Sequence, residues 1–275
     1  MTLEVACPAK LNLFLAVGPR DQRGYHPLRT IFQAVSLADR LVVSTDTDQD
    51  RFECDWPEVP AENTVTRVWR LLKEIAPLPP LYVRLQKHIP LESGMGGGSS
   101  DAAGMIRAVE ALIGKLPSKA EREAVATAVG MDVPFFLVGG RAKAEGYGDL
   151  LTPEQDRPES ESFVVLRPDL GCSTAAMYRA LDDRAFDWRD FPTEDEAHND
   201  FERVAPCECL DLIEWLNLRG AVQAGLSGSG SAVWGRFASA EVAEQVESMA
   251  RSALGVWSRA VRSLNRRESM AIQRA

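Results

Sequence analysis

A glycine-rich stretch (residues 89–103) constrains this chain more than any other feature of its sequence. It reads Ile-Pro-Leu-Glu-Ser-Gly-Met-Gly-Gly-Gly-Ser-Ser-Asp-Ala-Ala. Before it, residues 81–86 alternate between apolar and polar side chains, which is typical of a half-buried strand. After it, apolar residues recur at helical spacing as far as Gly114, which supplies a stop signal. The sequence therefore predicts a strand, a tight loop and a helix in direct succession.

Glycines and serines give this stretch the chemistry of an anion site. Glycine lets the backbone approach a ligand closely and turn its amides inward. A helix N-terminus adds unpaired N–H groups and the positive end of the helix dipole, so the ligand it favours is a phosphate. The candidate phosphate-binding residues are Gly94, Gly96, Gly97, Gly98, Ser99 and Ser100.

Three familiar kinds of phosphate loop do not match the stretch. A Walker loop needs a lysine before its last Ser or Thr, and none is present. The dinucleotide fingerprint has a third glycine where this chain has Ser99. The protein-kinase strings Val-Ala-Ile-Lys, His-Arg-Asp and Asp-Phe-Gly are absent. A flexible turn without a ligand is a further alternative, which the flanking strand and helix disfavour.

Composition narrows the class of protein. The 275 residues are 45% hydrophobic and 26% charged, as in an ordinary soluble globule of one large or two modest domains. A net charge of −9 argues against a general nucleic-acid or anionic-membrane surface, so a phosphorylated ligand must be held by local donors. We see no signal peptide and no long apolar run. Five irregularly spaced cysteines suit reduced thiols, and we expect a cytoplasmic protein.

Hydrophobic periodicity predicts both strands and helices along the chain. The expected strands are 3–17, 30–46, 81–86, 163–167, 221–224 and 231–237. The expected helices are 63–75, 102–113, 118–129, 174–182, 208–217 and 240–253. A stretch rich in proline and acidic residues, 152–161, interrupts the pattern, and we place a domain boundary there. The sequence predicts an α+β protein with two domains, 1–152 and 153–275, and not a regular βαβ series.

Two lone charges stand in apolar runs. Lys10 is the only charged residue between positions 7 and 17, and on a strand it shares a face with Asn12 while Leu15 takes the other. Asp132 is the only charged residue between positions 124 and 140. Each could be a surface charge at the end of an element. Together they indicate chemistry, because a lysine keeps a nearby carboxylate ionised and the carboxylate can orient or deprotonate a hydroxyl.

A second small-residue segment, the serine–glycine loop (residues 224–232), lies between two predicted strands. It reads Ala-Gly-Leu-Ser-Gly-Ser-Gly-Ser-Ala. Its glycines suit a tight turn that packs against a ligand or against another loop. Taken alone it is weak evidence, because turns of this composition are common.

These segments together resemble a known family. Cys7-Pro-Ala-Lys-Leu-Asn-Leu, the glycine-rich stretch and the serine–glycine loop are similar to the three motifs of the GHMP kinases, named for galacto-, homoserine, mevalonate and phosphomevalonate kinases. Arg23-Gly-Tyr-His, Asp132-Val-Pro and Asn199-Asp-Phe-Glu are typical of the branch that acts on a cytidine-diphosphate-linked methylerythritol. The resemblance extends from Cys7 to about Asn265.

The resemblance implies a two-domain kinase with an N-terminal domain of the ribosomal-protein-S5 type and an active site between the domains. It implies that the glycine-rich stretch binds the phosphates of ATP and that Asn63 and Lys87 lie near the nucleotide base. Asp132 matches the catalytic aspartate of the family, and Lys10 matches the lysine beside it. The residues assigned to the second substrate are Asn12, Tyr25, His26, Thr174, Tyr178 and Gly228. Among these, Tyr25 and His26 match residues that hold the cytosine.

The implied reaction is phosphoryl transfer from ATP, with Mg²⁺, to a hydroxyl of the methylerythritol part. The product is the 2-phosphate of the non-mevalonate route to isoprenoid precursors. Asp132 either accepts the hydroxyl proton or only orients the hydroxyl. The Mg²⁺ ligands are open, with Ser100 a candidate, while we expect Asp101 to order the loop. We expect a monomer or weak homodimer without nucleic-acid or membrane partners.

Two alternative functions use the same scaffold. A sister kinase for homoserine or mevalonate is the first, and Tyr25, His26 and Tyr178 count against it. A non-catalytic binding protein is the second, and it would be expected to have lost Lys10 or Asp132.

Overall fold

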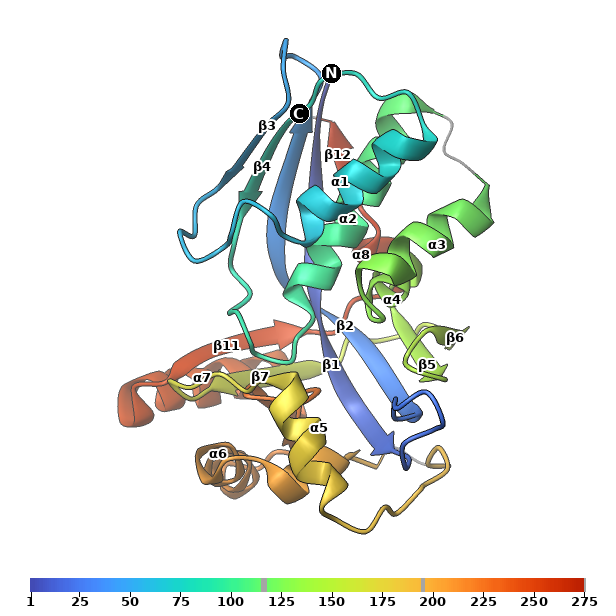
Figure 1. Ribbon diagram of the computed structural model, residues 1–275. Helices are drawn as coiled ribbons and strands as arrows, with labels where there is room; N and C mark the ends of the chain where they lie inside the picture. Colours follow the sequence, from blue (N-terminus) through green and yellow to red (C-terminus); the bar gives the residue numbers. More distant parts are fainter. Residues whose placement is uncertain (115–117, 194–195, 275) are drawn as a thin grey trace.

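The computed structural model describes residues 1–114, 118–193 and 196–274, which form two β-sheets with helices packed on them (Figure 1). The strands of the eight-stranded sheet are β1 (Thr2–Val17), β2 (Leu28–Ser44), β3 (Arg51–Cys54), β4 (Tyr82–Gln86), β5 (Arg141–Glu145), β6 (Leu150–Pro153), β8 (His198–Asn199) and β12 (Ile272–Arg274). The strands of the four-stranded sheet are β7 (Ser162–Arg167), β9 (Gln223–Leu226), β10 (Val233–Phe237) and β11 (Trp257–Arg262).

The helices pack in two groups. Those of the first half are α1 (Thr64–Ile75), α2 (Gly97–Ile113), α3 (Lys119–Val129) and α4 (Val133–Val138). Those of the second half are α5 (Thr174–Asp182), the 3-10 helix η1 (Asp200–Val204), α6 (Cys207–Leu218), α7 (Ala240–Leu254) and α8 (Arg266–Ser269). Helix α2 lies against β1 and β2, with α1 and α4 beside it, whereas α6 and α7 cover the smaller sheet.

The two sheets differ in how their strands are arranged. The larger sheet follows the order β12-β1-β2-β4-β3, with β5 also paired to β2 and β8 to β1. Its pairs are antiparallel except β3 with β4 and β1 with β8. The smaller sheet follows the order β11-β7-β10-β9 and is antiparallel throughout. This mixture confirms the predicted α+β class.

A long antiparallel pair, β1 with β2, spans the molecule from top to bottom in Figure 1. Its upper part carries α1 and α2, and its lower part lies beside elements of the second half. Leu11, Met95 and Phe163 belong to a buried cluster where the two sheets meet. Trp234 of β10 joins the same cluster and donates its indole N–H to the Asn12 carbonyl at 3.0 Å. The pair β1–β2 therefore connects both sheets to one central region.

Each predicted strand and helix has a counterpart in the structure. The helix predicted at 63–75 forms α1 with Asn63 as its N-cap, and Gly114 ends α2 in the left-handed conformation. Helix α2 begins at Gly97, five residues before the predicted start at 102. The sequence did not predict the short elements β3, β5, β6, β8, β11, β12, α4, α8 and η1. All of them span only two to six residues, which leaves little periodic pattern to recognise.

Segments of the second half return to the larger sheet. β12 pairs with β1 near the N-terminus, and β8 pairs with the far end of β1 in parallel. Accordingly, both chain ends lie close together at the top of Figure 1. The domain boundary near residue 152 stays a prediction. Across the described ranges, none of the helices has the length and apolar character needed to cross a bilayer.

The contact between α2 and β1 can be tested at Gly104. A Cβ atom there would lie 2.4 Å from the Cys7 sulfur. Alanine is preferred to glycine in a helix by about 1 kcal/mol, yet we expect Gly104→Ala to lower the free energy of unfolding by about 1–3 kcal/mol through overpacking. Combining it with Cys7→Ala should give a favourable coupling above about 1 kcal/mol in urea unfolding. Additive effects of the two substitutions would contradict this packing.

Candidate active site

A cavity of about 350 Å³, here called the central cavity, lies where β1, the glycine-rich stretch, α4, α5 and the serine–glycine loop meet. The predicted site residues that line it are Lys10, Asn12, Lys87, Gly94, Gly96, Gly97, Gly98, Ser99, Asp132, Thr174, Tyr178 and Gly228. The predicted site residues outside its lining are Tyr25, His26, Asn63 and Ser100. The structure therefore brings residues from distant parts of the sequence to one place.

Helix α2 begins at this cavity without a side-chain cap. Gly96 occupies the N-cap position in the left-handed conformation and has no side chain to bond the first-turn amides. By contrast, α1, α3, α5 and α7 begin with capping side chains. The first intrahelical bond at this end runs from the Ser100 amide to the Gly96 carbonyl at 2.9 Å. The amides before it have no partner within the helix, and they face a cavity lined by Gly97, Gly98 and Ser99.

The glycine-rich stretch packs directly on the serine–glycine loop. Gly94 has a φ of +71°, and a Cβ atom there would lie 2.0 Å from the Ser227 carbonyl oxygen, so only glycine fits. The Ser227 hydroxyl donates to the Gly94 carbonyl at 3.1 Å. Gly228 adjoins the same point and also leaves room for Lys10, because a Cβ atom on it would lie 3.2 Å from the lysine Nζ. The serine–glycine loop was predicted to pack against a ligand or against another loop. The second alternative is confirmed, because it packs against the glycine-rich stretch.

Lys10 is buried and begins a chain of hydrogen bonds. Its ammonium donates to the Asn12 Oδ1 atom, and the Asn12 amide donates to the Thr30 hydroxyl at 2.7 Å. Thr30 in turn donates to the Phe14 carbonyl at 2.6 Å. Burial lowers the pKa of Lys10, and the negative charge of Asp132 partly offsets that effect. The ammonium is thereby fixed at the cavity in a buried position.

Asp132 is half-buried at the N-cap position of α4. Its side chain does not cap that helix. Because Pro134 stands in the first turn and has no N–H to satisfy, the helix needs less capping there. The carboxylate is therefore left to the central cavity, which it lines together with Lys10.

A β-bulge changes the predicted faces of β1. The register with β2 shifts between Asn12 and Phe14, so Leu13 has no partner in the ladder. An extra residue restarts the alternation of faces. As a result Leu15 lines the central cavity on the same side as Lys10 and Asn12. The prediction that Leu15 takes the opposite face is wrong.

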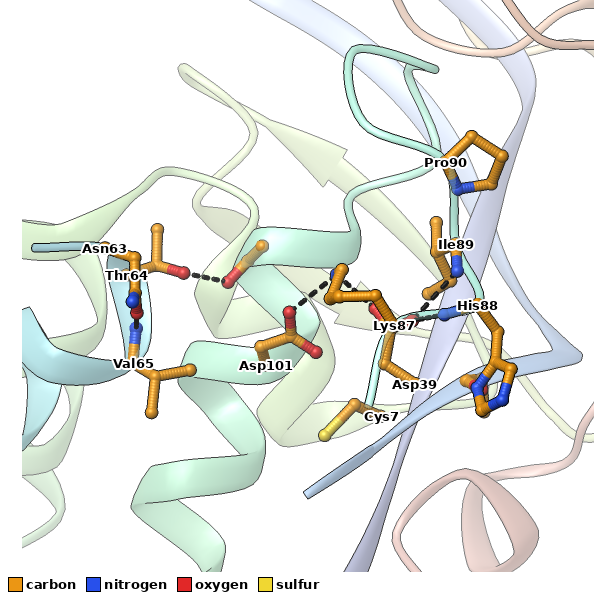
Figure 2. A network of polar contacts seen from close by, with 12 residues as sticks. Cys7, Asp39, Asn63, Thr64, Val65, Lys87, His88, Ile89, Pro90 and Asp101 are labelled. Carbon is orange, nitrogen blue, oxygen red and sulfur yellow. Dashed lines mark hydrogen bonds and ion pairs between the residues drawn. The ribbon is translucent and has the colours of Figure 1, made fainter. Parts of the chain in front are cut away.

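Lys87 lines the cavity from the end of β4 and forms a buried ionic cluster. Its ammonium donates to Asp39 on β2 and, at 2.8 Å, to Asp101 on α2 (Figure 2). Burial opposes the charge of Lys87, but the two carboxylates prevail and raise its pKa. Burial, followed by the charge of Asp39, raises the pKa of Asp101. The sequence did not predict a role for Asp39, because its partners lie 48 or more residues away.

Asn63 serves as a helix cap rather than as part of the cavity lining. Its side chain accepts from the amides of Val65 and Thr66 in a capping box. The next residue, Thr64, does line the cavity and donates its hydroxyl to the Gly98 carbonyl at 2.6 Å. Sequence reasoning missed Thr64, and the only signal for it was its place beside the cap.

Aromatic side chains gather at the other end of the cavity. Tyr178 of α5 stacks on His26 with ring centroids 5.2 Å apart, and burial raises the pKa of Tyr178 to about 12. His26 is buried, and its Nδ1 lies 2.9 Å from the Gly18 carbonyl. Tyr25 is 61% exposed, and its ring lies against Tyr147 at 5.6 Å. Tyr25 and Tyr178 thus contact different aromatic neighbours.

Thr174 closes this end of the cavity against the serine–glycine loop. Its hydroxyl is 2.9 Å from the hydroxyl of Ser229. Asn199, the last residue of β8, donates to the carbonyls of Leu226 and Gly228 at 2.9 and 2.8 Å. The loop is therefore held from both sides, and Phe201 lines the cavity next to it.

Known proteins are similar to this chain in sequence and in fold. A family model described as the GHMP kinases N-terminal domain matches residues 63–140. A 4-diphosphocytidyl-2-C-methyl-D-erythritol kinase of Polaromonas naphthalenivorans is 35% identical over 261 residues, which is 85% of each chain. A solved 4-(cytidine 5'-diphospho)-2C-methyl-D-erythritol kinase has a TM-score of 0.81 and 32% identity, covering 94% of this chain and 98% of that one. A homoserine kinase of Cytophaga hutchinsonii, 16% identical with a TM-score of 0.74 over 99% of this chain and 97% of that chain, shares the fold.

Three features define a GHMP kinase: the fold, the matching domain model, and the cavity where β1, the glycine-rich stretch and the serine–glycine loop meet. Within that class the likeness extends over most of both chains at more than 30% identity. The chain belongs to the family of 4-diphosphocytidyl-2-C-methyl-D-erythritol kinases.

The contact between the two loops predicts an unequal response to alanine at two glycines. Gly255, past the end of α7, has a φ of +66° and open space around it, so Gly255→Ala should cost only about 1 kcal/mol. Gly94→Ala adds the clash with the Ser227 carbonyl. We expect it to lower the free energy of unfolding by at least about 2 kcal/mol more than Gly255→Ala. Equal losses in thermal or urea unfolding would show that the loops do not meet this closely.

Proposed function

We propose that this protein transfers the γ-phosphoryl group of ATP to a hydroxyl of 4-diphosphocytidyl-2-C-methyl-D-erythritol. The product is the 2-phosphate, in the non-mevalonate route to isoprenoid precursors. One observation carries the proposal. Lys10 and Asp132 line the same cavity as the uncapped start of α2. A site for the phosphates of ATP therefore lies beside a pair of catalytic charges. We place this reaction in the cytoplasm, with the protein a monomer or weak homodimer.

The start of α2 holds the phosphates of ATP in this proposal. The first-turn amides of Gly97, Gly98 and Ser99 have no intrahelical partners, and the helix dipole adds positive potential there. Phosphoryl transfer has a loose transition state, so positioning and charge neutralisation contribute most of the catalysis. A chain with a net charge of −9 needs such local donors to hold ATP.

Lys10 and Asp132 act on the acceptor hydroxyl. The Lys10 ammonium is fixed by Asn12 and offsets the charge that gathers on the phosphoryl group. Burial lowers the pKa of Lys10, and the nearby charge of Asp132 partly offsets this effect because it favours the ammonium form. Asp132 then orients the hydroxyl and accepts its proton as the new phosphate ester forms.

Mg²⁺ enters this site with the phosphates of ATP. In the described ranges, no group of three His, Cys, Asp or Glu side chains is arranged to hold a metal ion. Ser99 lines the cavity, whereas the Ser100 hydroxyl is fully buried without a hydrogen-bond partner. We therefore assign to Ser99 the hydroxyl that faces Mg-ATP. When bound, the ion neutralises charge on the β- and γ-phosphates.

The aromatic end of the cavity holds the cytidine part of the acceptor. Tyr178 offers a ring face and Thr174 a hydroxyl at the cavity wall. His26 supports Tyr178 from behind by stacking on it. We assign to Tyr25, which is exposed and lies outside the cavity lining, the covering of the base from the solvent side. The cytidine part of the acceptor is thus held by residues outside the glycine-rich stretch, which gives the site its specificity for the acceptor.

An ADP-release assay with ATP, Mg²⁺ and 4-diphosphocytidyl-2-C-methyl-D-erythritol tests the reaction. We expect turnover by the wild type and a fall in kcat of at least about 10²-fold in Asp132→Asn. The exposed Asp211 on α6 supplies a matched control, and Asp211→Asn should retain full activity. Turnover of homoserine or mevalonate in place of the cytidyl acceptor would overturn the proposed substrate.

Substitution of Tyr178 tests the cytidine site. Tyr178→Phe keeps the ring that stacks on His26, so KM for the cytidyl acceptor should stay within about threefold. Tyr178→Leu removes the ring and should raise that KM about tenfold while the KM for ATP is unchanged. If the two variants had the same KM for the cytidyl acceptor, the cytidine would have to bind elsewhere.

A further inference from the structure

Three successive amides follow the end of β4 and lead into the glycine-rich stretch. β4 ends at Gln86, and beyond it the backbone no longer pairs in the sheet. The Lys87 amide donates to the Asp55 carboxylate at 2.9 Å. The amides of His88 and Ile89 donate to one oxygen of Asp39, at 2.8 Å for Ile89 (Figure 2). Carboxylates thus replace sheet partners over the whole lead-in segment.

Asp39 is the residue that joins this segment to the rest of the fold. It lies on β2 and is 1% exposed. One of its oxygens accepts the two amides, and the other accepts the Lys87 ammonium. A carboxylate with three donors on its two oxygens is held in one orientation in a buried site.

Lys87 passes this restraint on to the start of α2. Its ammonium also binds Asp101, in the second turn of that helix, at 2.8 Å. Residues 87–89, the lead-in segment, also pack directly against the first turn of α2. A Cβ atom on Gly97 would lie 3.0 Å from the Ile89 side chain and 3.3 Å from the Lys87 Nζ. Movement of residues 87–89 would therefore move the amides that face the central cavity.

The charges of the cluster tie the Lys87 ammonium to its protein partners. Its single positive charge faces two carboxylates, Asp39 and Asp101, both buried. Cys7 on β1 and Arg107 on α2 also act electrostatically within this group, and burial holds the Cys7 thiol protonated by raising its pKa. An ammonium so engaged holds the loop in place at the wall of the central cavity.

We propose that Asp39 is a positioning residue for the nucleotide. Through the amides of His88 and Ile89 and through Lys87, it fixes where the glycine-rich stretch begins and so where the amides of α2 meet a phosphate. The inference rests on the proposed function only in taking ATP as the ligand. Asp101 completes the contact from the helix side, and an amide oxygen at that position suffices for the bond to Lys87.

Kinetics of three variants test this role. Asp39→Asn turns an N–H group toward the Lys87 ammonium and leaves that charge poorly paired. We expect it to raise the KM for ATP at least about tenfold, with the KM for the cytidyl acceptor unchanged. Asp101→Asn keeps an oxygen for Lys87 and relieves a like charge, so its KM for ATP should stay within about threefold. Glu247→Gln, a buried carboxylate of α7 bonded to Ser258, is the matched control with both KM values unchanged.

The outcomes separate this inference from the proposed function. A merely structural Asp39 would lower the folded, active fraction in Asp39→Asn and leave both KM values as they are, which overturns the inference. Equal increases in both KM values would also overturn it. Equilibrium binding of ATP without acceptor gives the second measurement. The wild type could prove inactive while Asp39→Asn binds ATP about tenfold more weakly than the wild type does. That result would sustain the inference and refute the proposed reaction.

Discussion

An α-helix that begins without a capping side chain must obtain partners for its first amides from elsewhere. Helix α2 begins in this way, on a left-handed glycine, at the wall of the central cavity. The surrounding structure keeps that helix start open and in place. The Ser227 hydroxyl donates to the Gly94 carbonyl, the Thr64 hydroxyl donates to the Gly98 carbonyl, and Asp39 accepts from the backbone before the loop. The proposed phosphate site is thus built from backbone, and the side chains of Ser227, Thr64 and Asp39 position it.

Two buried lysines stand at this site in a chain whose net charge is −9. Lys10 and Lys87 line the same cavity but are held differently. Lys87 is bonded to two buried carboxylates, and its charge is used within the protein. Lys10 donates to the neutral Asn12 and has Asp132 as its nearby charge, so it keeps positive potential for a ligand. This contrast assigns chemistry to one lysine and positioning to the other.

Local features of the sequence predicted much of this arrangement. The end of α2 at Gly114 and the shared face of Lys10 and Asn12 were predicted correctly. Both features depend only on the spacing of neighbouring residues. The face of Leu15 was wrong because a bulge depends on the partner strand, which local alternation does not report. Asp39 was missed for a similar reason, since its partners lie on β4 and α2, 48 or more residues away. Long-range contacts decide such positions, and a single sequence shows no trace of them.

A crystal structure with a non-hydrolysable ATP analogue, Mg²⁺ and the cytidyl acceptor tests the central claim most directly. The account predicts a phosphate bonded to the first-turn amides of α2 at Gly97, Gly98 and Ser99. It also predicts the acceptor hydroxyl between that phosphate and the side chains of Lys10 and Asp132. Phosphates bound away from the start of α2, or an acceptor hydroxyl out of reach of Asp132, would contradict the account.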